Sequence, residues 1–406
     1  MMLLRPKARA LTMPGLDFTS LTDPGEIQAR VDQMPTFLPD RKQFFYRAAE
    51  DLREAGFWCS PGAAVGSGPS RIFLGVSGGL DSILLPYFAL YLARRLPQIL
   101  PLPPCILHFN HGLRPPADQG EARFLRALAD HLGLLYEEGE GDVCGLAARA
   151  HLGTEEAART LRHGFFASRL THPGDRLFLA HHADDRAETL LLNLQRGAGL
   201  QGLGALPQRR GNIWRPFLRY QKSELEAFAR QAALDWCEDQ TNQEAFCARN
   251  RLRLDLIPSW NAMAGYDIRP KITALASEVE DWMALLGPEL AEALAACRLG
   301  TSCLNSYQLA TYPSPLRRLV LRAFVRDAVK DPGFFLRRDQ VLMVDRLLED
   351  RLREEGKKKA ALDLGGGRSF LLNQGILSIK EERSSKAQDP GARPKLFPAE
   401  GDDEVF

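Results

Sequence analysis

The stretch Ser77-Gly78-Gly79-Leu80-Asp81-Ser82 constrains this chain more than any other, because of what lies on either side of it. A short apolar run, residues 71–76, precedes it and has the composition of a buried parallel strand, and a helical pattern, residues 83–96, follows it. A strand, a glycine turn and a helix start together form an anion site, where backbone N–H groups and the helix dipole favour negative charge. The loop therefore predicts a phosphate-binding site.

Each residue type in this loop has a use at such a site. The glycines let a phosphate approach the backbone closely. Ser77 and Ser82 can donate hydroxyl hydrogen bonds to phosphate oxygens, and Asp81 can hold a magnesium ion. The loop lacks the Lys-Ser/Thr ending of the Walker motif, which argues against γ-phosphate transfer. The alternative is a tight turn that happens to contain two glycines. The predicted nucleotide-binding residues of the loop are Ser77, Gly78, Gly79, Leu80, Asp81 and Ser82.

Apolar runs and helical patterns alternate along the chain from residue 71. The later strand candidates are residues 105–109, 134–136, 176–180 and 213–214, and the helix candidates between them are residues 118–132, 143–170 and 184–195. This β-α-β-α order predicts an α/β fold with a doubly wound parallel sheet, in which ligands bind at the carboxyl ends of the strands.

Past residue 258 the pattern changes. Helices are expected at residues 270–286, 288–298, 315–329 and 337–355, and a β-meander at residues 360–364, 370–372 and 376–379. We therefore expect an N-terminal extension with one helix (1–60), a nucleotide-binding catalytic domain (61–262), a smaller, mostly helical domain with a terminal β-meander (263–385) and a disordered tail (386–406).

Charge and cysteine content exclude several classes of protein. The 52 Lys and Arg against 51 Asp and Glu give a net charge of +1, so any contact with nucleic acid must come from local basic patches. The 7 cysteines include no Cys-x-x-Cys pair, which argues against a disulfide framework, a zinc ribbon and a cysteine-held iron–sulfur cluster. No apolar run approaches the roughly 20 residues of a membrane span. Residues 1–14 lack the apolar region of a secretory signal, so the cytoplasm is expected, with an organellar address as the alternative.

Two further segments follow strand candidates and should lie at the same sheet edge as the glycine loop. His111 and Arg114, after the second strand, can meet the nucleotide or shape its pocket. His108 and His111 are three apart, so metal binding is an alternative, although no third ligand is adjacent.

Asp185 and Glu188 open the helix after the fourth strand and, being three apart, share one helix face. Acidic residues in a first helical turn also occur for the helix dipole alone. Because the pair shares the sheet edge with Asp81, where a magnesium ion or a cationic substrate would sit, we favour a function in binding.

Arginines recur at helical spacing in three places. Each pattern fits the solvated face of a helix, and the third also fits a basic stripe for a phosphate backbone. The residues are Arg159 and Arg162, then Arg249, Arg251 and Arg253 around Asn250, and finally Arg318, Arg322 and Arg326.

Several segments, in this order, carry a family resemblance. They are SGGLDS, HFNHGLR, EEAARTLRHGFF, LAHHADDRAETLLLNLQRGAGLQGL, WRPFL, WCEDQTNQ, and ARNRLR followed by Leu256-Ile257-Pro258. SGGLDS alone resembles the PP-loop of ATP pyrophosphatases, which cleave between the α- and β-phosphates. The whole set, over about residues 71–260, resembles the tRNA(Ile)-lysidine synthetase family. His163 and Cys247 depart from the family pattern, which bears on local packing more than on chemistry.

The resemblance implies an enzyme that uses ATP and Mg²⁺. It would adenylate carbon 2 of the wobble cytidine in an isoleucine tRNA with a CAU anticodon, and the ε-amine of free lysine would then displace AMP. The tRNA and lysine would be its partners, with a homodimer as one option for its assembly. The residues implied in catalysis are Asp81, which would also hold the metal, Asp185, Glu188, Arg159 and Arg162, and those implied in tRNA binding are Arg249, Asn250, Arg253, Arg318 and Arg322.

Two other functions stay open. One is another PP-loop tRNA-modifying enzyme such as a tRNA thiolase, although those relatives typically use paired cysteines. The other is a non-catalytic nucleotide-binding regulator, which has no need for Asp81 or for the pair Asp185 and Glu188.

Overall fold

The computed structural model describes residues 23–38, 43–57, 71–95, 102–150, 152–204, 206–237, 248–329, 336–353, 360–365, 367–381 and 396–398. The chain divides into a first unit, from residues 1–189 and 206–273, and a second unit, from residues 190–205 and 274–406. Helix α7 (Ala183–Gln195) and helix α12 (Arg269–Cys297) contribute residues to both units. None of the helices in the described part is long and apolar enough to cross a membrane.

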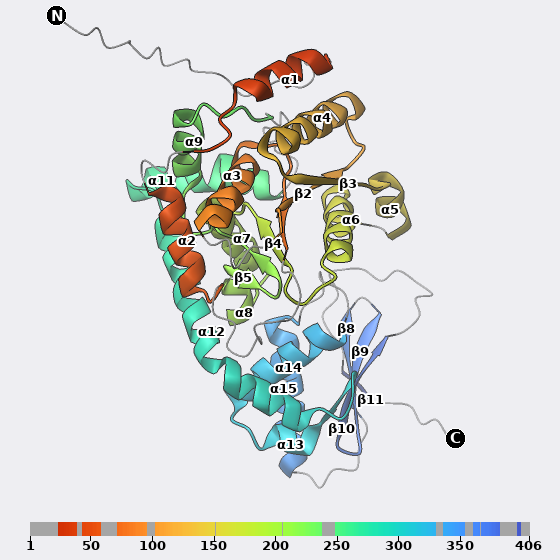
Figure 1. The fold of residues 1–406 in the computed structure, drawn as a ribbon. Helices are drawn as coiled ribbons and strands as arrows, with labels where there is room; N and C mark the ends of the chain where they lie inside the picture. The colour runs from red at the N-terminus through yellow and green to blue at the C-terminus, as the bar shows by residue number, and fades with distance from the viewer. Residues whose placement is uncertain are drawn as a thin grey trace, which may run out of the picture. The chain divides into compact units, whose positions relative to one another are not determined.

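A mostly parallel six-stranded sheet forms the centre of the first unit (Figure 1). Its order is β3-β2-β1-β4-β6-β5, and all neighbours run parallel except β5 and β6. The strands are β1 (Ile72–Gly75), β2 (Cys105–Asn110), β3 (Leu135–Glu140), β4 (Arg176–Leu179), β5 (Arg209–Arg210) and β6 (Ile213–Trp214). The predicted parallel α/β sheet is confirmed, with β3 longer than expected and β5 added at the edge.

The strand order creates a switch point beside β1. The chain runs outward from β1 through β2 to β3 and then returns to place β4 on the other side of β1. The loops that follow β1 and β4 therefore diverge at the carboxyl ends of two neighbouring strands, where open α/β sheets bind their ligands. The loop after β1 is the glycine loop, and the loop after β4 carries His181 and His182.

Helices cover both faces of this sheet. Ile72 and Leu74 of β1 belong to a large core that includes side chains of α3 (Leu80–Arg95), α4 (Pro115–Leu132) and α9 (Lys222–Gln231). Phe73, between them, belongs to a second core with Phe166 of α6 (Thr154–Arg169). Successive strand side chains point to opposite faces, so the doubly wound arrangement is confirmed. Helix α5 (Val143–Ala150) precedes α6, and together they account for the helical region expected at residues 143–170.

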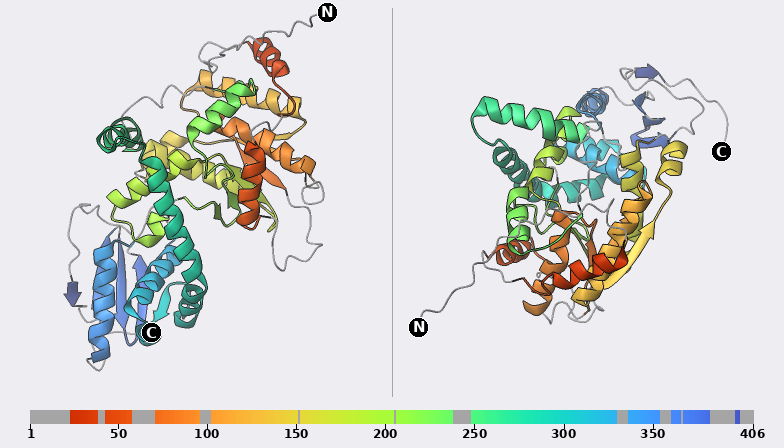
Figure 2. Two further views of the ribbon diagram at one scale, coloured as in Figure 1. Left: turned by 90° about the vertical axis from the view of Figure 1, so that its left-hand side faces the viewer. Right: turned by 90° about the horizontal axis from the view of Figure 1, so that it is seen from above.

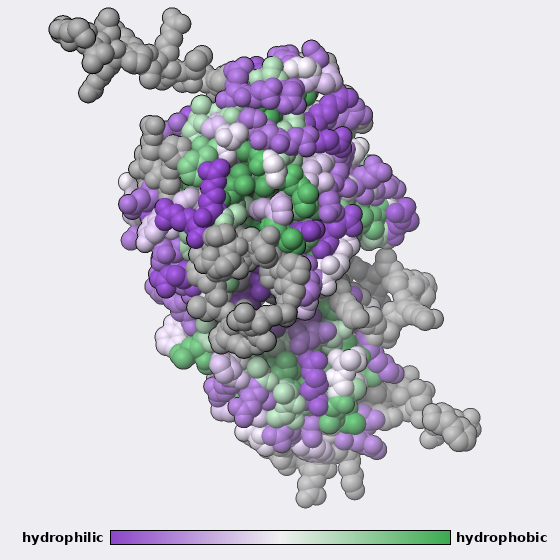
Figure 3. Space-filling view, viewed as in Figure 1, coloured by the Kyte–Doolittle hydropathy of each residue, from purple (hydrophilic) through white to green (hydrophobic). Residues whose placement is uncertain are grey.

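Two helices precede β1. Helix α2 (Phe44–Glu54) is the helix expected in the N-terminal extension, and its apolar residues Phe44, Phe45, Ala48 and Leu52 are buried. Helix α1 (Pro24–Gln33) is a second helix in the extension, for which one helix was expected. Asp23 caps it by accepting a hydrogen bond from the Gly25 N–H at 2.9 Å, and Pro24 starts it. Its outer surface is mostly hydrophilic, at the top of Figure 3, while Ile27 and Val31 are buried.

The second unit combines helices with an antiparallel sheet of order β11-β8-β9-β10-β7. The strands are β7 (Cys303–Asn305), β8 (Ala360–Gly365), β9 (Arg368–Asn373), β10 (Ile376–Glu381) and β11 (Leu396–Pro398). The expected β-meander is confirmed as β8-β9-β10, with β7 added at one edge. Strand β11, at the other edge, falls within residues 386–406, which were expected to lack structure, and the rest of that segment lies outside the described residues.

Helices α14 (Ser314–Ala328) and α15 (Arg338–Arg353) pack against this sheet through one apolar core that includes Phe324, Val344 and Phe370 (Figure 2). The short helices α8 (Leu200–Leu203) and α13 (Ser306–Ala310) belong to the same unit. Helix α12 differs from the sequence expectation, since it runs unbroken through Pro288 where two helices were predicted. Gly287 precedes that proline and has no β-carbon to clash with its ring, so the helix can continue.

Candidate active site

The glycine loop after β1 is held in shape by its own hydrogen bonds. Ser82 Oγ donates to the Gly79 carbonyl at 2.9 Å and accepts from the Ser77 N–H at 3.2 Å. Gly78 has a φ of 90°, a conformation that favours glycine, and its carbonyl accepts the Cys237 N–H at 2.9 Å. A β-carbon on Gly78 would lie 2.8 Å from Cys237 Sγ. The loop is therefore preformed, as a phosphate-binding loop needs to be.

His108, on β2, supports the start of this loop. Its side chain is buried, and Nδ1 lies 3.1 Å from the Val76 carbonyl. A carbonyl only accepts, so Nδ1 carries the proton. Burial lowers the pKa of His108, which keeps the ring neutral. Among the described residues, no group of three or more His, Cys, Asp or Glu side chains is arranged to hold a metal by itself.

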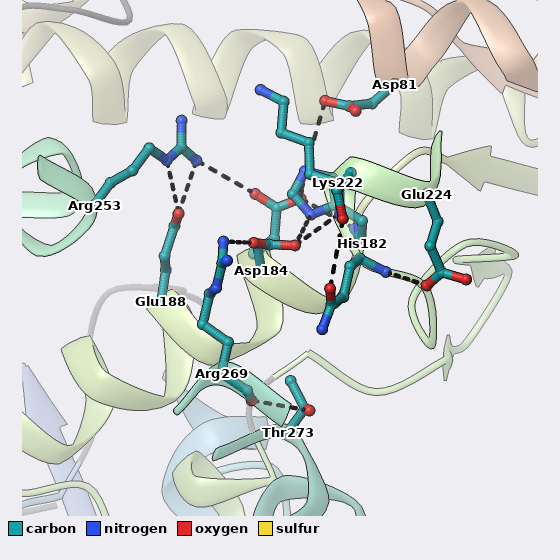
Figure 4. A network of polar contacts seen from close by, with 12 residues as sticks. Asp81, His182, Asp184, Glu188, Lys222, Glu224, Arg253, Arg269 and Thr273 are labelled. Atoms are coloured by element: carbon teal, nitrogen blue, oxygen red, sulfur yellow. Dashed lines mark hydrogen bonds and ion pairs between the residues drawn. The ribbon is translucent and has the colours of Figure 1, made fainter. Parts of the chain in front are cut away.

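His182, in the loop after β4, lies among three carboxylates (Figure 4). Its Nε2 is 3.6 Å from Asp81 Oδ2 and 3.5 Å from Asp185 Oδ2, and its Nδ1 is 3.5 Å from Asp184 Oδ2. Burial alone would lower its pKa, but the carboxylates outweigh burial and raise the pKa of His182 to about 10. At neutral pH the ring is a buried cation that joins the glycine loop to the first turn of α7.

Asp184 anchors the same turn to two other elements (Figure 4). Its Oδ2 accepts the Lys222 N–H at 2.8 Å, at the start of α9, and its Oδ1 pairs with Arg269, at the start of α12. Burial would raise the pKa of Asp184, but His182, the Lys222 N–H and Arg269 hold it well below its usual range. The sequence pattern alone does not single out His182, Asp184 or Arg269. The sequence does contain a run of polar residues after a strand, which indicates a candidate site. That pattern cannot predict which residues of other strands and helices these side chains contact.

Asp81 fits a magnesium ion. Its Oδ1 is buried and has no hydrogen-bond partner among the described residues, while its Oδ2 faces His182. A buried carboxylate oxygen without a partner is costly. Carboxylate and phosphate oxygens are the ligands that Mg²⁺ prefers, so a magnesium ion between Asp81 and a bound phosphate would satisfy this oxygen.

Asp185 and Glu188 share one face of α7, as predicted, and both face arginine. Glu188 is buried and accepts two hydrogen bonds from Arg253, Nε to Oε1 at 2.8 Å and Nη2 to Oε2 at 3.0 Å. Arg249 Nε lies 3.4 Å from Glu188 Oε2, and Arg253 Nη2 lies 4.0 Å from Asp185 Oδ1. The negative charge of Glu188 is therefore balanced by two arginines, whereas Asp185 lies between Arg253 and His182.

A π-helical turn carries Arg253. Helix α10 (Ala248–Arg251), the π-helical segment Leu252–Leu256 and helix α11 (Ile257–Ala264) follow one another without a break. The Ile257 N–H donates to the Leu252 carbonyl, five residues back, and Pro258, which has no N–H, comes next. Such wider turns often occur at functional sites.

Arginines also surround three neutral histidines in the first unit. Burial holds the pKa of His181 well below its usual range, and Arg215 and Arg162 lower it further. The pKa values of His163 and His111 are lowered to about 4. In both cases burial is the largest cause and the charge of Arg162 is the second. Since cations outnumber anions around these rings, the region favours an anionic ligand.

The remaining predicted residues have varied surroundings. Arg159, beside Arg162 on α6, is exposed, and Asn250 lies partly buried on α10. Arg114 pairs with Asp118 at 3.8 Å and with Glu121 at 3.5 Å, both on α4. Contacts of these residues with ATP or tRNA stay predictions.

Arg318 and Arg322 make contacts inside the second unit. Arg318 Nε donates to Asp345 Oδ2 at 2.6 Å, and Arg322 Nη1 donates to the Leu336 carbonyl at 2.7 Å. A β-carbon on Gly199 would lie 2.9 Å from the Arg322 guanidinium carbon. As tRNA contacts, both arginines stay predictions. Residues 238–247, which include most of the segment WCEDQTNQ as well as Cys247, lie outside the described residues.

The strand, the preformed glycine loop, the helix start and the unpaired Asp81 oxygen together define a PP-loop nucleotide-binding domain, and the PP-loop domain family model matches residues 57–260. The tRNA(Ile)-lysidine synthase of Pseudomonas aeruginosa is 38% identical over 265 residues, which cover 62% of this chain and 52% of that protein. The chain belongs to the tRNA(Ile)-lysidine synthase family of PP-loop proteins.

Two more relatives show the extent of the match. The tRNA(Ile)-lysidine synthase of Ralstonia nicotianae is 36% identical over 270 residues, covering 65% of this chain and 56% of that protein. That of Chlorobaculum tepidum is 32% identical over 226 residues, covering 55% of this chain and 67% of that protein. The chain spans about half the length of the Pseudomonas and Ralstonia relatives.

Proposed function

We propose that this protein is an ATP-dependent carbon–nitrogen ligase that makes lysidine in isoleucine tRNA with a CAU anticodon. The observation that carries the proposal is the unpaired Asp81 oxygen at the switch point, between a preformed PP-loop and the carboxylates around His182. The carbonyl oxygen on carbon 2 of the wobble cytidine attacks the α-phosphorus of ATP, and pyrophosphate leaves. The lysine ammonium loses a proton, the resulting ε-amine attacks carbon 2, the bond from carbon 2 to the AMP oxygen breaks, and the attached nitrogen loses a second proton.

The glycine loop would hold the phosphates of ATP. Ser77 and the backbone of Gly78 and Gly79 would supply the hydroxyl and N–H donors for the phosphate oxygens. Mg²⁺, when bound at Asp81, would neutralise charge on the departing pyrophosphate. His111 and Arg114 are proposed to border the nucleotide from the loop after β2.

The carboxylates around His182 would attract the lysine ammonium. Asp184 is already paired with Arg269, and Asp81 would hold Mg²⁺, whereas the ion pairs of Asp185 are long, 3.5 Å to His182 and 4.0 Å to Arg253, which leaves it the most open to a further cation. Of the predicted pair, we favour Asp185, because Glu188 is already paired with Arg253 and Arg249.

The arginines around the neutral histidines would receive the tRNA. Arg159, Arg162 and Arg249 can neutralise backbone phosphates or orient the cytidine. An anticodon loop is single-stranded, so its wobble base can be splayed into a pocket. We assign tRNA recognition also to residues 263–385, including Arg318 and Arg322, and we expect the enzyme in the cytoplasm, with a homodimer as one option.

The direct test is transfer of labelled lysine to purified isoleucine tRNA bearing the CAU anticodon, with ATP and Mg²⁺. We expect stable label at the wobble nucleotide, none when ATP is omitted, and none on a methionine tRNA with the same anticodon. Pyrophosphate release without label would keep adenylation and overturn lysine as the nucleophile. If a folded protein that binds ATP gave neither label nor pyrophosphate, the result would indicate a nucleotide-binding regulator.

A further inference from the structure

The turn of residues 219–222 holds the first turn of α7 through its backbone. The Tyr220 carbonyl accepts the Ala183 N–H at 2.8 Å, and the Lys222 N–H donates to Asp184 Oδ2 at 2.8 Å. Ala183 and Asp184 directly follow His182 in the chain. The position of this turn therefore sets the position of the carboxylates around His182.

Asp51, on α2 of the N-terminal extension, binds two side chains of the same turn. Its Oδ1 accepts a hydrogen bond from Arg219 Nη1 at 2.8 Å, and its Oδ2 accepts one from the Tyr220 hydroxyl at 2.8 Å. The Asp51 side chain is only 15% exposed and Tyr220 is buried, so water competes weakly for the hydrogen bond between these two residues. Burial and the Asp51 carboxylate both raise the pKa of Tyr220, which keeps its hydroxyl a donor.

Packing supports the same connection. The Phe44 ring of α2 lies 4.9 Å from the Tyr220 ring and 5.6 Å from the Phe217 ring, between centroids. Aromatic pairs at such distances add to the stability that burial alone gives. Because the ring and the hydroxyl of Tyr220 are both held from α2, the turn has little freedom to move independently of that helix.

We propose that Asp51 is a positioning residue, which fixes the first turn of α7, and with it His182 and Asp184, through the turn of residues 219–222. The role in the reaction rests on the proposed function. Asp51 contacts none of the predicted catalytic residues directly, and acts through Tyr220 and the Tyr220 carbonyl. The N-terminal helix α2 is then part of what preorganises the active site.

The test uses three variants, Asp51→Ala, Tyr220→Phe and the double variant that combines these two changes. Each is compared with the control Glu54→Ala. Glu54 is the matched control, since it is on the same helix and pairs with the same Arg219 at 3.1 Å without the bond to Tyr220. We expect kcat for lysine transfer to fall about tenfold in both single variants, because small displacements of reacting groups cost large factors in rate. The double variant should fall no further than Asp51→Ala, since that change already removes the hydrogen bond to Tyr220. The control should match the unmodified protein.

Amide hydrogen exchange supplies the readout that does not need activity. Peptides covering residues 181–190 should exchange faster in Asp51→Ala and Tyr220→Phe, and at the original rate in Glu54→Ala. Unchanged exchange there overturns the proposal. Faster exchange with an unchanged kcat, measured well below the melting temperature, overturns the role in the reaction. An unmodified protein without lysine transfer speaks against the proposed function instead, and exchange alone then decides whether Asp51 positions α7.

Discussion

Arg253 and Glu188 meet in a two-pronged ion pair, with Nε 2.8 Å from Oε1 and Nη2 3.0 Å from Oε2. Glu188 is 2% exposed, so its charge depends on these partners. Arg253→Ala would leave it with Arg249 alone, and we expect a loss of about 2 kcal/mol in the free energy of unfolding. Urea denaturation at pH 7 measures this loss. Arg251→Ala, on the same helix but exposed, should stay within about 0.5 kcal/mol of the unmodified protein. Equal losses in both variants would contradict a specific role for the pair.

Asp81→Ala should abolish tRNA-dependent release of pyrophosphate and leave the fold intact. The change removes the unpaired Oδ1 that fits Mg²⁺, together with one of the carboxylates around His182. The Mg²⁺ dependence of ATP binding should weaken in parallel, because the metal loses its protein ligand. Circular dichroism and the melting temperature check the fold. A well-folded Asp81→Ala protein that still released pyrophosphate would rule out the magnesium role.

Gly78 and Gly79 should respond differently to alanine. Gly78 has a φ of 90°, and a β-carbon there would lie 2.8 Å from Cys237 Sγ, whereas a β-carbon on Gly79 would meet only Ser77 Oγ, at 3.7 Å. We expect Gly78→Ala to destabilise the fold by about 1–3 kcal/mol through backbone strain and the contact with Cys237. Thermal unfolding of both variants without nucleotide tests this. A Gly79→Ala protein as unstable as Gly78→Ala would show that the loop, and not the φ of Gly78, sets the cost.

The features that the sequence predicts correctly are those that neighbouring residues determine. The glycine loop between a strand and a helix is continuous in the chain, and the shared face of Asp185 and Glu188 follows from helical spacing. Strand patterns predict a parallel sheet because buried strands are apolar throughout. These local rules give the α/β fold and four residues, Asp185, Glu188, Arg249 and Arg253, that the structure brings together.

The contacts that the sequence does not predict depend on strand order and on long-range packing. His182 meets Asp81 only because β4 lies next to β1, and Asp184 meets Arg269 only because α12 begins beside α7. The same limit applies to Arg318, whose helical spacing is that of a solvated face but whose partner, Asp345, comes from α15. Spacing along one helix cannot show a partner on another.

The stability of the second unit should depend on pH through Asp345. Its Oδ1 accepts a hydrogen bond from Arg317 Nε at 2.7 Å, and its Oδ2 accepts from Ser314 Oγ and from Arg318 Nε, both at 2.6 Å. Burial would raise the pKa of Asp345, but these hydrogen bonds outweigh burial and lower it below its usual range. A carboxyl group with a lower pKa in the folded state stabilises the fold fully at neutral pH. That stabilisation is lost as the pH falls from about 5 through the folded-state pKa.

Urea denaturation between pH 7 and pH 3 tests this dependence with Asp345→Asn. The variant should be less stable than the unmodified protein at pH 7, because Arg317 and Arg318 lose their charged partner. The difference should shrink at pH 3, below the ordinary pKa of an aspartate, because the unfolded state then binds a proton more readily than the folded state. Asp339→Asn is the control, since Asp339 is exposed on α15 and 3.4 Å from Arg337. A difference between Asp345→Asn and the unmodified protein that is the same at both pH values would mean that packing, and not the charge on Asp345, stabilises this part of the fold.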